Sequence, residues 1–259
     1  MPAAPIQITV LGSGTSVGVP TIGCHCAVCT SNDPRDNRLR PSILVTFEGR
    51  NILIDTTPDF RAQALRAKIG HLDAVVFTHA HADHIMGLDD VRPFNFRQKA
   101  RLPIFAAPDT MEAIQRCFRY IFDGVKRESN VPQLDTRVLD GAPFDVCGLE
   151  FQPVPILHGS ATIYGYRFGN AAYLTDHSEV PPASLELLHG LDVLFLDALR
   201  YKPHPTHTTV DQAVRIAQGL QARRTFLTHI CHDLGHERAE SLLPPNVRLA
   251  YDGLELQVE

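Results

Sequence analysis

The chain has 259 residues, of which 44% are hydrophobic and 20% are charged, and its formal net charge is −5. This composition is typical of a soluble globular protein with a full core, and it lacks the strongly basic balance of a non-specific nucleic-acid- or membrane-binding protein. The start of the chain has no basic segment followed by an apolar run, and no stretch of ~18 apolar residues occurs, so we expect a cytoplasmic protein without a signal peptide or membrane span.

Apolar runs bounded by Gly, Pro, Asn or Asp predict strands at short intervals. These runs span 6–12, 42–47, 51–56, 74–79, 102–108, 149–158, 162–169, 171–176, 192–198 and 224–229. A last pair, 247–251 and 254–258, is split by Asp-Gly, which favours a β-hairpin. Amphipathic patterns predict helices at 58–69, 81–96, 108–122, 180–189 and 209–221. Strands interspersed with helices, with no linker or repeat, predict one α/β domain over residues 1–259.

Several of the predicted strands end in a histidine or an aspartate. The segments "VVFTHAH", "PILH", "YLTD" and "TFLTH" place His79, His158, Asp176 and His229 at such ends. Residues at strand ends point into one crevice at the edge of a sheet, which is the usual place for an α/β active site. This convergence predicts a functional site more strongly than any one residue does.

The segment "THAHADH" supplies a dense set of potential metal ligands. His79 and His81 are two apart on an extended segment, so both side chains face the same way and can bind one cation. Asp83 and His84 follow at the expected start of a helix and can reach a second cation. Imidazole and carboxylate are ligands that divalent metals such as zinc prefer.

This motif, followed by a strand-end His, a strand-end Asp and a final strand-end His, resembles the metallo-β-lactamase superfamily. The resemblance implies an αββα sandwich with a two-metal site, holding Zn or Mn, in the crevice between its sheets. It further implies the following ligand sets: His79, His81 and His158 for one cation, Asp83, His84 and His229 for the other, and Asp176 bridging both. We also expect Asp83 to be a catalytic residue. Asp176 is preferred to its neighbour His177 because a carboxylate can bridge two cations and a neutral imidazole cannot.

The segment "LRYKPHPTHTT" supplies a candidate for proton transfer to the leaving group. His207 precedes a predicted helix whose N-cap is Thr208 or Thr209, so it can act as a general acid and contact a phosphate oxygen. The pattern His207-Thr208-Thr209 resembles the His-Ser-Thr segment of ribonuclease Z and the equivalent segment of the cyclic phosphodiesterases. His204 is more typical of a solvated loop residue. Arg200 and Lys202 are candidates for binding phosphate, and solvated loop charges are the alternative.

The segment "GCHCAVCTS" holds three cysteines whose spacing suits one tetrahedral zinc that needs a fourth ligand. The arrangement Cys24, Cys26 and Cys29 resembles the phosphoribosyl 1,2-cyclic phosphate phosphodiesterase family of the carbon–phosphorus lyase pathway. That resemblance implies a structural zinc site on the loop 23–30, completed by His232, three residues after the last active-site histidine. Cys231 is the alternative fourth ligand. A disulfide framework is disfavoured because cysteines two or three residues apart pair with poor geometry.

Two further features surround the predicted crevice. Asp55 ends the predicted strand 51–56, and we expect it to orient a ligand histidine. The segment 117–133 is expected to fold over the crevice and to set specificity, with Tyr120 and Arg127 as candidate contacts.

These observations predict a dimetal phosphodiesterase that hydrolyses a small, cyclic phosphodiester such as phosphoribosyl 1,2-cyclic phosphate. A hydroxide between the cations attacks phosphorus, and His207 protonates the leaving oxygen. The alternatives are a ribonuclease Z-like tRNA 3′-processing endonuclease, which usually needs a basic substrate-clamping arm, and a non-phosphate hydrolase or cofactor-biosynthesis member of the superfamily. We expect a small-molecule substrate, no stable nucleic-acid or membrane partner, and a chain compatible with a homodimer.

Overall fold

A computed structural model describes residues 5–125 and 128–259, and its strands form two sheets of seven. The first sheet has the order β14-β1-β2-β3-β4-β5-β6 and the second β13-β12-β11-β10-β9-β8-β7. The strands of the first sheet are β14 (Glu255–Val258), β1 (Ile6–Gly12), β2 (Ser42–Phe47), β3 (Arg50–Ile54), β4 (Ala74–Val76), β5 (Leu102–Ala106) and β6 (Leu134–Val138). Those of the second are β13 (Val247–Leu249), β12 (Arg224–Thr228), β11 (Val193–Asp197), β10 (Ala171–Leu174), β9 (Ala161–Phe168), β8 (Leu149–His158) and β7 (Phe144–Val146).

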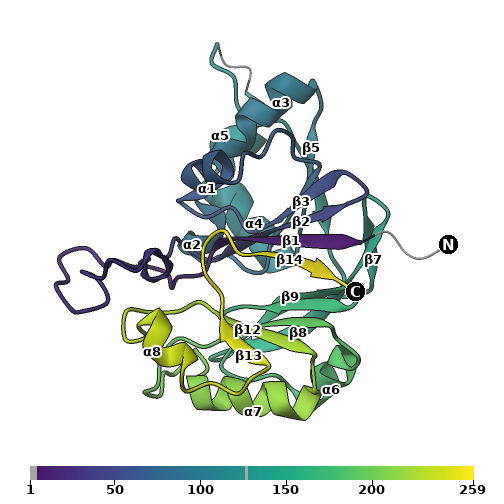
Figure 1. The fold of residues 1–259 in the computed structure, drawn as a ribbon. Helices are drawn as coiled ribbons and strands as arrows, with labels where there is room; N and C mark the ends of the chain where they lie inside the picture. Colours follow the sequence, from purple (N-terminus) through teal and green to yellow (C-terminus); the bar gives the residue numbers. More distant parts are fainter. Residues whose placement is uncertain (1–4, 126–127) are drawn as a thin grey trace.

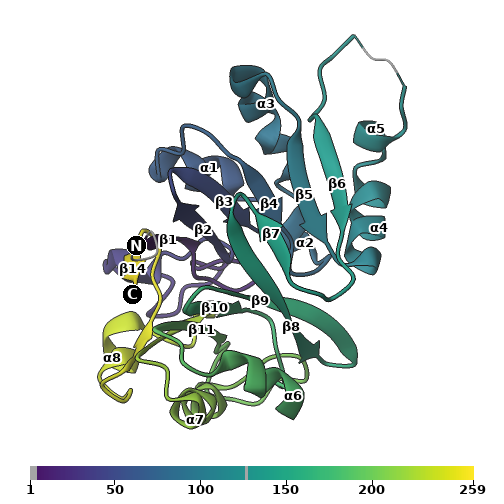
Figure 2. The ribbon, with the colours of Figure 1, turned by 90° about the vertical axis from the view of Figure 1, so that its right-hand side faces the viewer.

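Helices cover the outer face of each sheet, as Figures 1 and 2 show. The first sheet is covered by α1 (Phe60–Arg66), α2 (Ala82–Ile85), η2 (Leu88–Val91), α3 (Arg92–Gln98), α4 (Pro108–Cys117) and α5 (Arg119–Phe122). The second is covered by α6 (Pro182–Leu185), η3 (Glu186–Leu188), α7 (Val210–Leu220) and α8 (His236–Glu240). None of the described helices combines the length and apolar character that a membrane crossing requires.

The core consists of three apolar layers that follow from this arrangement. The central layer lies between the sheets and contains the fully buried Tyr166, Phe168 and Phe195. The outer layers pack each sheet against its helices. The αββα sandwich that the sequence predicts is therefore confirmed. The inner faces are apolar, so the polar residues gather at the sheet edge.

The last two strands do not form the hairpin that their Asp-Gly connection favours. β13 pairs in parallel with β12 in the second sheet, whereas β14 pairs antiparallel with β1 in the first. The physical reason lies in Asp252, whose carboxylate accepts hydrogen bonds from the Ser13 and Leu39 backbone N–H groups at 2.9 Å. The turn is used to cross from one sheet to the other.

The predicted helix 81–96 is broken into α2, η2 and α3. Gly87 packs so tightly that a Cβ there would lie 1.9 Å from the Thr57 carbonyl oxygen, and its N–H donates to the Thr56 carbonyl oxygen. Pro93, at the second position of α3, has no N–H to continue a longer helix. The short strands β6 and β7 are not predicted from the sequence, because their polar residues alternate too weakly with apolar ones.

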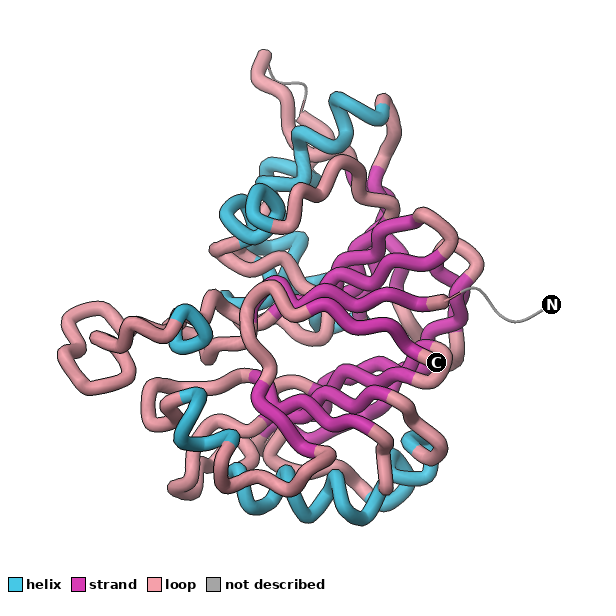
Figure 3. The backbone as a smooth tube through the Cα atoms, in the orientation of Figure 1, coloured by secondary structure: helices cyan, strands magenta, loops and turns pink. Residues whose placement is uncertain are grey.

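The segment between β1 and β2 extends outward from the two sheets (Figure 3). Within the described residues it holds only the short 3-10 helix η1 (Pro34–Asp36). This segment carries the three clustered cysteines. The start of this segment is fixed to the loop after β12, because Gly14 forms a parallel β-bridge with Ile230 of that loop.

Candidate active site and metal centres

Three site residues follow the ends of strands with an unusual backbone conformation. Asp55, Asp176 and His229 follow β3, β10 and β12 with φ of 66°, 57° and 58°. The left-handed region costs free energy for residues other than glycine, and such strain persists where the surrounding structure holds it. Each turn directs a polar side chain across the sheet edge instead of along the strand. The three residues therefore come from both sheets to one crevice.

The residues expected at the first cation site do converge. One ligand atom each from His79, His81, His158 and Asp176 lie within 4.8 Å of one another. Nε2 of His79 is 3.0 Å from Nδ1 of His81, so two ring nitrogens face each other. Their mutual approach is explained if both lone pairs are directed at a common cation.

The residues expected at the second cation site form an adjoining cluster. Atoms of Asp83, His84, Asp176 and His229 lie within 4.8 Å of one another, and all four side chains are buried. Nε2 of His84 is 3.2 Å from one Asp176 oxygen, and Nε2 of His229 is 3.2 Å from the other. Asp176 thus belongs to both clusters, as a bridging carboxylate must.

Unpartnered buried atoms show that these residues fit divalent cations. Oδ2 of Asp83, Nε2 of His84 and Nε2 of His229 are buried without a hydrogen-bond partner. A buried polar group without a partner is costly, and several at one point indicate a missing charge. A pair of divalent cations sharing Asp176 would satisfy these atoms. His177, the rejected alternative, turns elsewhere, because its Nδ1 lies 2.7 Å from the Thr208 hydroxyl.

Hydrogen bonds at Nδ1 fix the ring orientation of three predicted ligands. His84 donates to Asp55 at 2.7 Å, and His158 donates to the Thr206 carbonyl oxygen at 2.8 Å. His79 lies 3.0 Å from the Thr78 hydroxyl, which in turn donates to Asp55 at 2.8 Å. With the proton on Nδ1, the Nε2 lone pair of each ring is free for a cation. Asp55 is placed where the sequence leads us to expect a ligand-orienting carboxylate.

At the second cation cluster, carboxylates and histidines shift each other's pKa values. Burial lowers the pKa of His229, but Asp176 and the neighbouring carboxylates outweigh it and raise that pKa to about 9. Burial opposes ionisation of Asp83, yet His84 and His229 hold its pKa well below the usual range. A cation that binds here takes the place of these protons. Metal binding is therefore coupled to proton release.

Asp197 is the functional residue that sequence reasoning missed. It is fully buried at the end of β11, with Oδ2 at 3.2 Å from Nδ1 of His207 and Oδ1 at 3.5 Å from Nδ1 of His229. The Thr208 backbone N–H also donates to it at 3.0 Å. One carboxylate thus faces both the candidate acid and a predicted ligand, whose rings stack at 4.6 Å. The signal was available: "LFLDA" is another apolar strand that ends in an acidic residue.

The loop between β11 and α7 is held by its own side chains. Thr209 caps α7 in a capping box with Gln212, which resolves the choice between the two threonines. Arg200 donates to the carbonyl oxygens of Lys202 and Pro203, at 3.2 and 3.0 Å, so its guanidinium braces the loop. Lys202 is exposed. No hydrogen bond or ion pair among the described residues joins either side chain to the two cation clusters.

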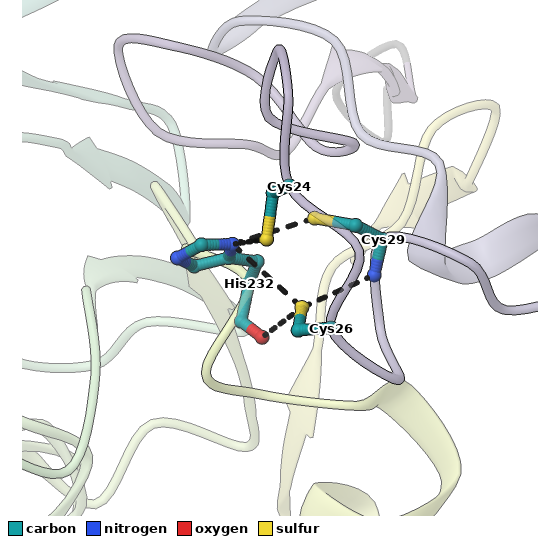
Figure 4. Close-up of side chains that lie close together, drawn as sticks. All are labelled: Cys24, Cys26, Cys29 and His232. Atoms are coloured by element: carbon teal, nitrogen blue, oxygen red, sulfur yellow. Dashed lines mark hydrogen bonds between the residues drawn. The ribbon is translucent and has the colours of Figure 1, made fainter.

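The cysteine cluster forms a separate site with His232 (Figure 4). Nδ1 of His232 lies 3.2, 3.8 and 3.3 Å from the sulfurs of Cys24, Cys26 and Cys29. Four ligands around one tetrahedral zinc are expected about 3.5 Å apart for this pair of atom types. Cys231 is outside the cluster, and its sulfur instead accepts from the Asp233 N–H at 3.4 Å. The geometry therefore favours His232 over Cys231 as the fourth ligand.

A fully buried arginine ties this site to the loop after β12. Arg38 pairs with Asp36 at 2.9 Å and donates to the carbonyl oxygens of Cys231 and Leu234 at 3.1 and 2.7 Å. These carbonyls flank His232, and the same loop begins at His229. Hydrogen bonds from Arg38 therefore join the segment that carries the cysteines to the loop that carries His229 and His232.

The described residues of the segment 117–133 make hydrogen bonds to η2 and α3 on the outer face of the first sheet. Tyr120 donates to Asp89 at 2.6 Å, and Arg92 donates to the Asn130 carbonyl oxygen at 3.0 Å. Arg127, the second candidate contact, lies outside the described residues. The expectation that this segment sets specificity stays a prediction.

Comparison with known proteins identifies the family. A family model described as "Beta-lactamase superfamily domain" matches residues 50–230, which is most of the chain. The chain belongs to the β-lactamase superfamily. Together with the two candidate cation sites, this membership identifies the chain as a metal-dependent hydrolase.

Three proteins with similar sequences or structures indicate which members of the superfamily this chain resembles. A crystal structure of a diphosphatase from the PhnP family is 54% identical, with a TM-score of 0.93, and the match covers 98% of this chain and 97% of that one. An octanoyltransferase from Porphyromonas gingivalis is 39% identical over 98% of this chain, but the chain spans only 52% of that protein's length. A ribonuclease Z from Bradyrhizobium diazoefficiens is 28% identical over 78% of each chain. The PhnP-family structure is thus similar along its whole length.

Proposed function

We propose that this protein is a dimetal phosphodiesterase of small substrates, acting on a phosphorus that carries two ester-type linkages and a single negative charge. Cyclic phosphodiesters have such a phosphorus, and so does each centre in a diester of diphosphate. The 54% identical diphosphatase of the PhnP family supports this class. The octanoyltransferase name does not define the activity, because the chain spans about half of that protein.

One observation carries the proposal: His207 lies against predicted ligands of both cation sites. Its ring is 4.9 Å from that of His158 and 4.6 Å from that of His229. Two divalent cations, when bound, acidify water and offset the negative charge of the phosphoryl group. His207 is then the group placed to serve the leaving oxygen.

His207 transfers the proton that the leaving group needs during hydrolysis of the phosphodiester. The oxygen of water bonds to phosphorus, and the bond from phosphorus to the leaving oxygen breaks. His207 gives its Nε2 proton to that oxygen and regains one from the water that was consumed. Asp197 stabilises the protonated imidazole through Nδ1, and its burial keeps competing water away. Asp55 keeps the His84 ring in place throughout.

A substrate panel tests the proposal. Protein loaded with Zn²⁺ or Mn²⁺ is assayed on bis(p-nitrophenyl) phosphate, ribose 1,2-cyclic phosphate, nucleoside 2′,3′- and 3′,5′-cyclic phosphates, ADP-ribose, p-nitrophenyl phosphate and a precursor tRNA. We expect turnover of diesters and little of the monoester. Absence of any diesterase activity with both metals would refute the proposal, and selective cleavage of the precursor tRNA would favour the ribonuclease Z alternative.

A further inference from the structure

A second histidine on the β11–α7 loop lies beside the proposed acid. The ring of His204 is 5.0 Å from that of His207, and the two planes are tilted by 45°. Among the described residues His207 is its sole aromatic ring neighbour, whereas His207 also contacts His158 and His229. His204 is therefore one ring further from the cation clusters than His207.

Local hydrogen bonds fix which nitrogen of His204 carries its proton. The Thr206 backbone N–H donates to Nδ1 of His204 at 3.3 Å, and the Thr206 hydroxyl lies 3.2 Å from the same atom. A backbone N–H can only donate, so Nδ1 is an unprotonated acceptor and the proton of the neutral ring is on Nε2. In the part of the chain that the structure describes, this Nε2 has no hydrogen-bond partner and is not sealed in the interior. It is a fixed N–H donor beside the site.

The loop around His204 is braced to hold this donor. Arg200 donates to the carbonyl oxygens of Lys202 and Pro203, directly before His204. The backbone N–H of Val210 donates to the Arg200 carbonyl oxygen at 3.1 Å, which joins the loop to α7. His204 is only partly exposed, although it is on a surface loop. The His204 ring is thus held in one orientation on a loop that is itself fixed by hydrogen bonds.

We propose that His204 binds the leaving group and gives the site its preference for substrates with a second phosphate, that is, for diphosphate diesters. Its Nε2–H donates to an anionic oxygen of the leaving phosphate while His207 serves the bridging oxygen. This inference rests on the proposed phosphodiesterase function and deepens it. A substrate whose leaving group has no second phosphate cannot use this contact.

Inhibition of the metal-loaded protein tests His204 directly. The probes are methylenediphosphonate, whose P–C–P link cannot be hydrolysed, and inorganic phosphate, both competing with bis(p-nitrophenyl) phosphate. We expect His204→Ala to raise the inhibition constant of methylenediphosphonate about ten- to a hundred-fold, the range for losing one hydrogen bond to a charged group. The constant for phosphate and the KM for bis(p-nitrophenyl) phosphate should change less than about three-fold on the same argument.

Two further variants make the result specific. His204→Gln retains a neutral N–H donor and should recover most of the affinity for methylenediphosphonate. His189→Ala removes an exposed histidine outside the β11–α7 loop, where it pairs with Glu186 three residues earlier, and should change neither inhibition constant. Equal effects on both probes, or no effect of His204→Ala, would overturn the assignment. If the native protein hydrolyses no diester, the proposed function fails, and calorimetric titration of methylenediphosphonate still decides the role of His204.

Discussion

At the scale of single residues, Asp197 has the most consequences for chemistry. Its carboxylate is buried, faces Nδ1 of both His207 and His229, and accepts from the Thr208 N–H. A carboxylate at Nδ1 of a histidine keeps a proton on that nitrogen and leaves Nε2 directed toward the crevice. Asp197 therefore orients the proposed acid His207 and lies close to the predicted metal ligand His229.

The acid role of His207 predicts a dependence on the leaving group. His207→Ala should lower kcat about 10²- to 10⁴-fold for a cyclic phosphate, whose alkoxide leaving group needs a proton. Turnover of bis(p-nitrophenyl) phosphate should fall less than about ten-fold, since nitrophenolate leaves unprotonated. Steady-state kinetics on both substrates check this, with metal content as the control. An equal loss on both substrates, or loss of metal, would contradict the acid role.

At the scale of elements, the cysteine loop is an anchor for the loop that begins at His229. The Gly14–Ile230 bridge and the Arg38 contacts join the two loops, and His232 links them through the cysteine cluster. A metal at this closed site would add to folding stability rather than to catalysis, because all four positions are filled by protein ligands.

Replacement of one cysteine tests this separation of roles. Cys24→Ser should lower bound metal from about three to about two per chain. The variant should also melt at a temperature at least about 5 °C lower. Each kcal/mol of unfolding free energy that is lost lowers the melting temperature by roughly 2–4 °C in a protein of this size. Cys231→Ser is the matched control, because Cys231 is next to His232 in the chain but belongs to none of the candidate ligand sets, and it should keep full metal content. If Cys231→Ser loses the metal and His232→Ala does not, the fourth ligand is assigned wrongly.

The sequence predicts those elements that depend on interactions between residues close together in the chain. The strands that end at Asp55, Asp176 and His229 are evident because buried apolar runs stop at a polar residue. The β13–β14 hairpin was wrong because the carboxylate of Asp252 is recruited by Ser13 and Leu39, which are distant in sequence. The helix 81–96 was wrong because Gly87 packs against the Thr57 carbonyl. The donor at His204 could not be predicted, because it depends on the folding of its loop onto Thr206.

At the scale of the whole molecule, the active site joins the two sheets. His79, His81, Asp83 and His84 follow β4 of the first sheet. His158 ends β8 of the second sheet, and Asp176 and His229 follow its strands β10 and β12. Each cation cluster contains ligands from both sheets. Divalent cations are therefore expected to stabilise the sandwich as well as to support hydrolysis, because a ligand that binds only the folded state raises its stability.

A metal titration of the metal-free protein tests the central claim most directly. Diesterase activity on bis(p-nitrophenyl) phosphate and melting temperature are followed as Zn²⁺ or Mn²⁺ is added, with Asp176→Asn as the control because it removes the shared carboxylate. We predict that activity appears only as the two crevice sites fill, that the melting temperature rises with it, and that Asp176→Asn shows neither change. Diesterase activity in the metal-free protein, or full activity in Asp176→Asn, would contradict the account.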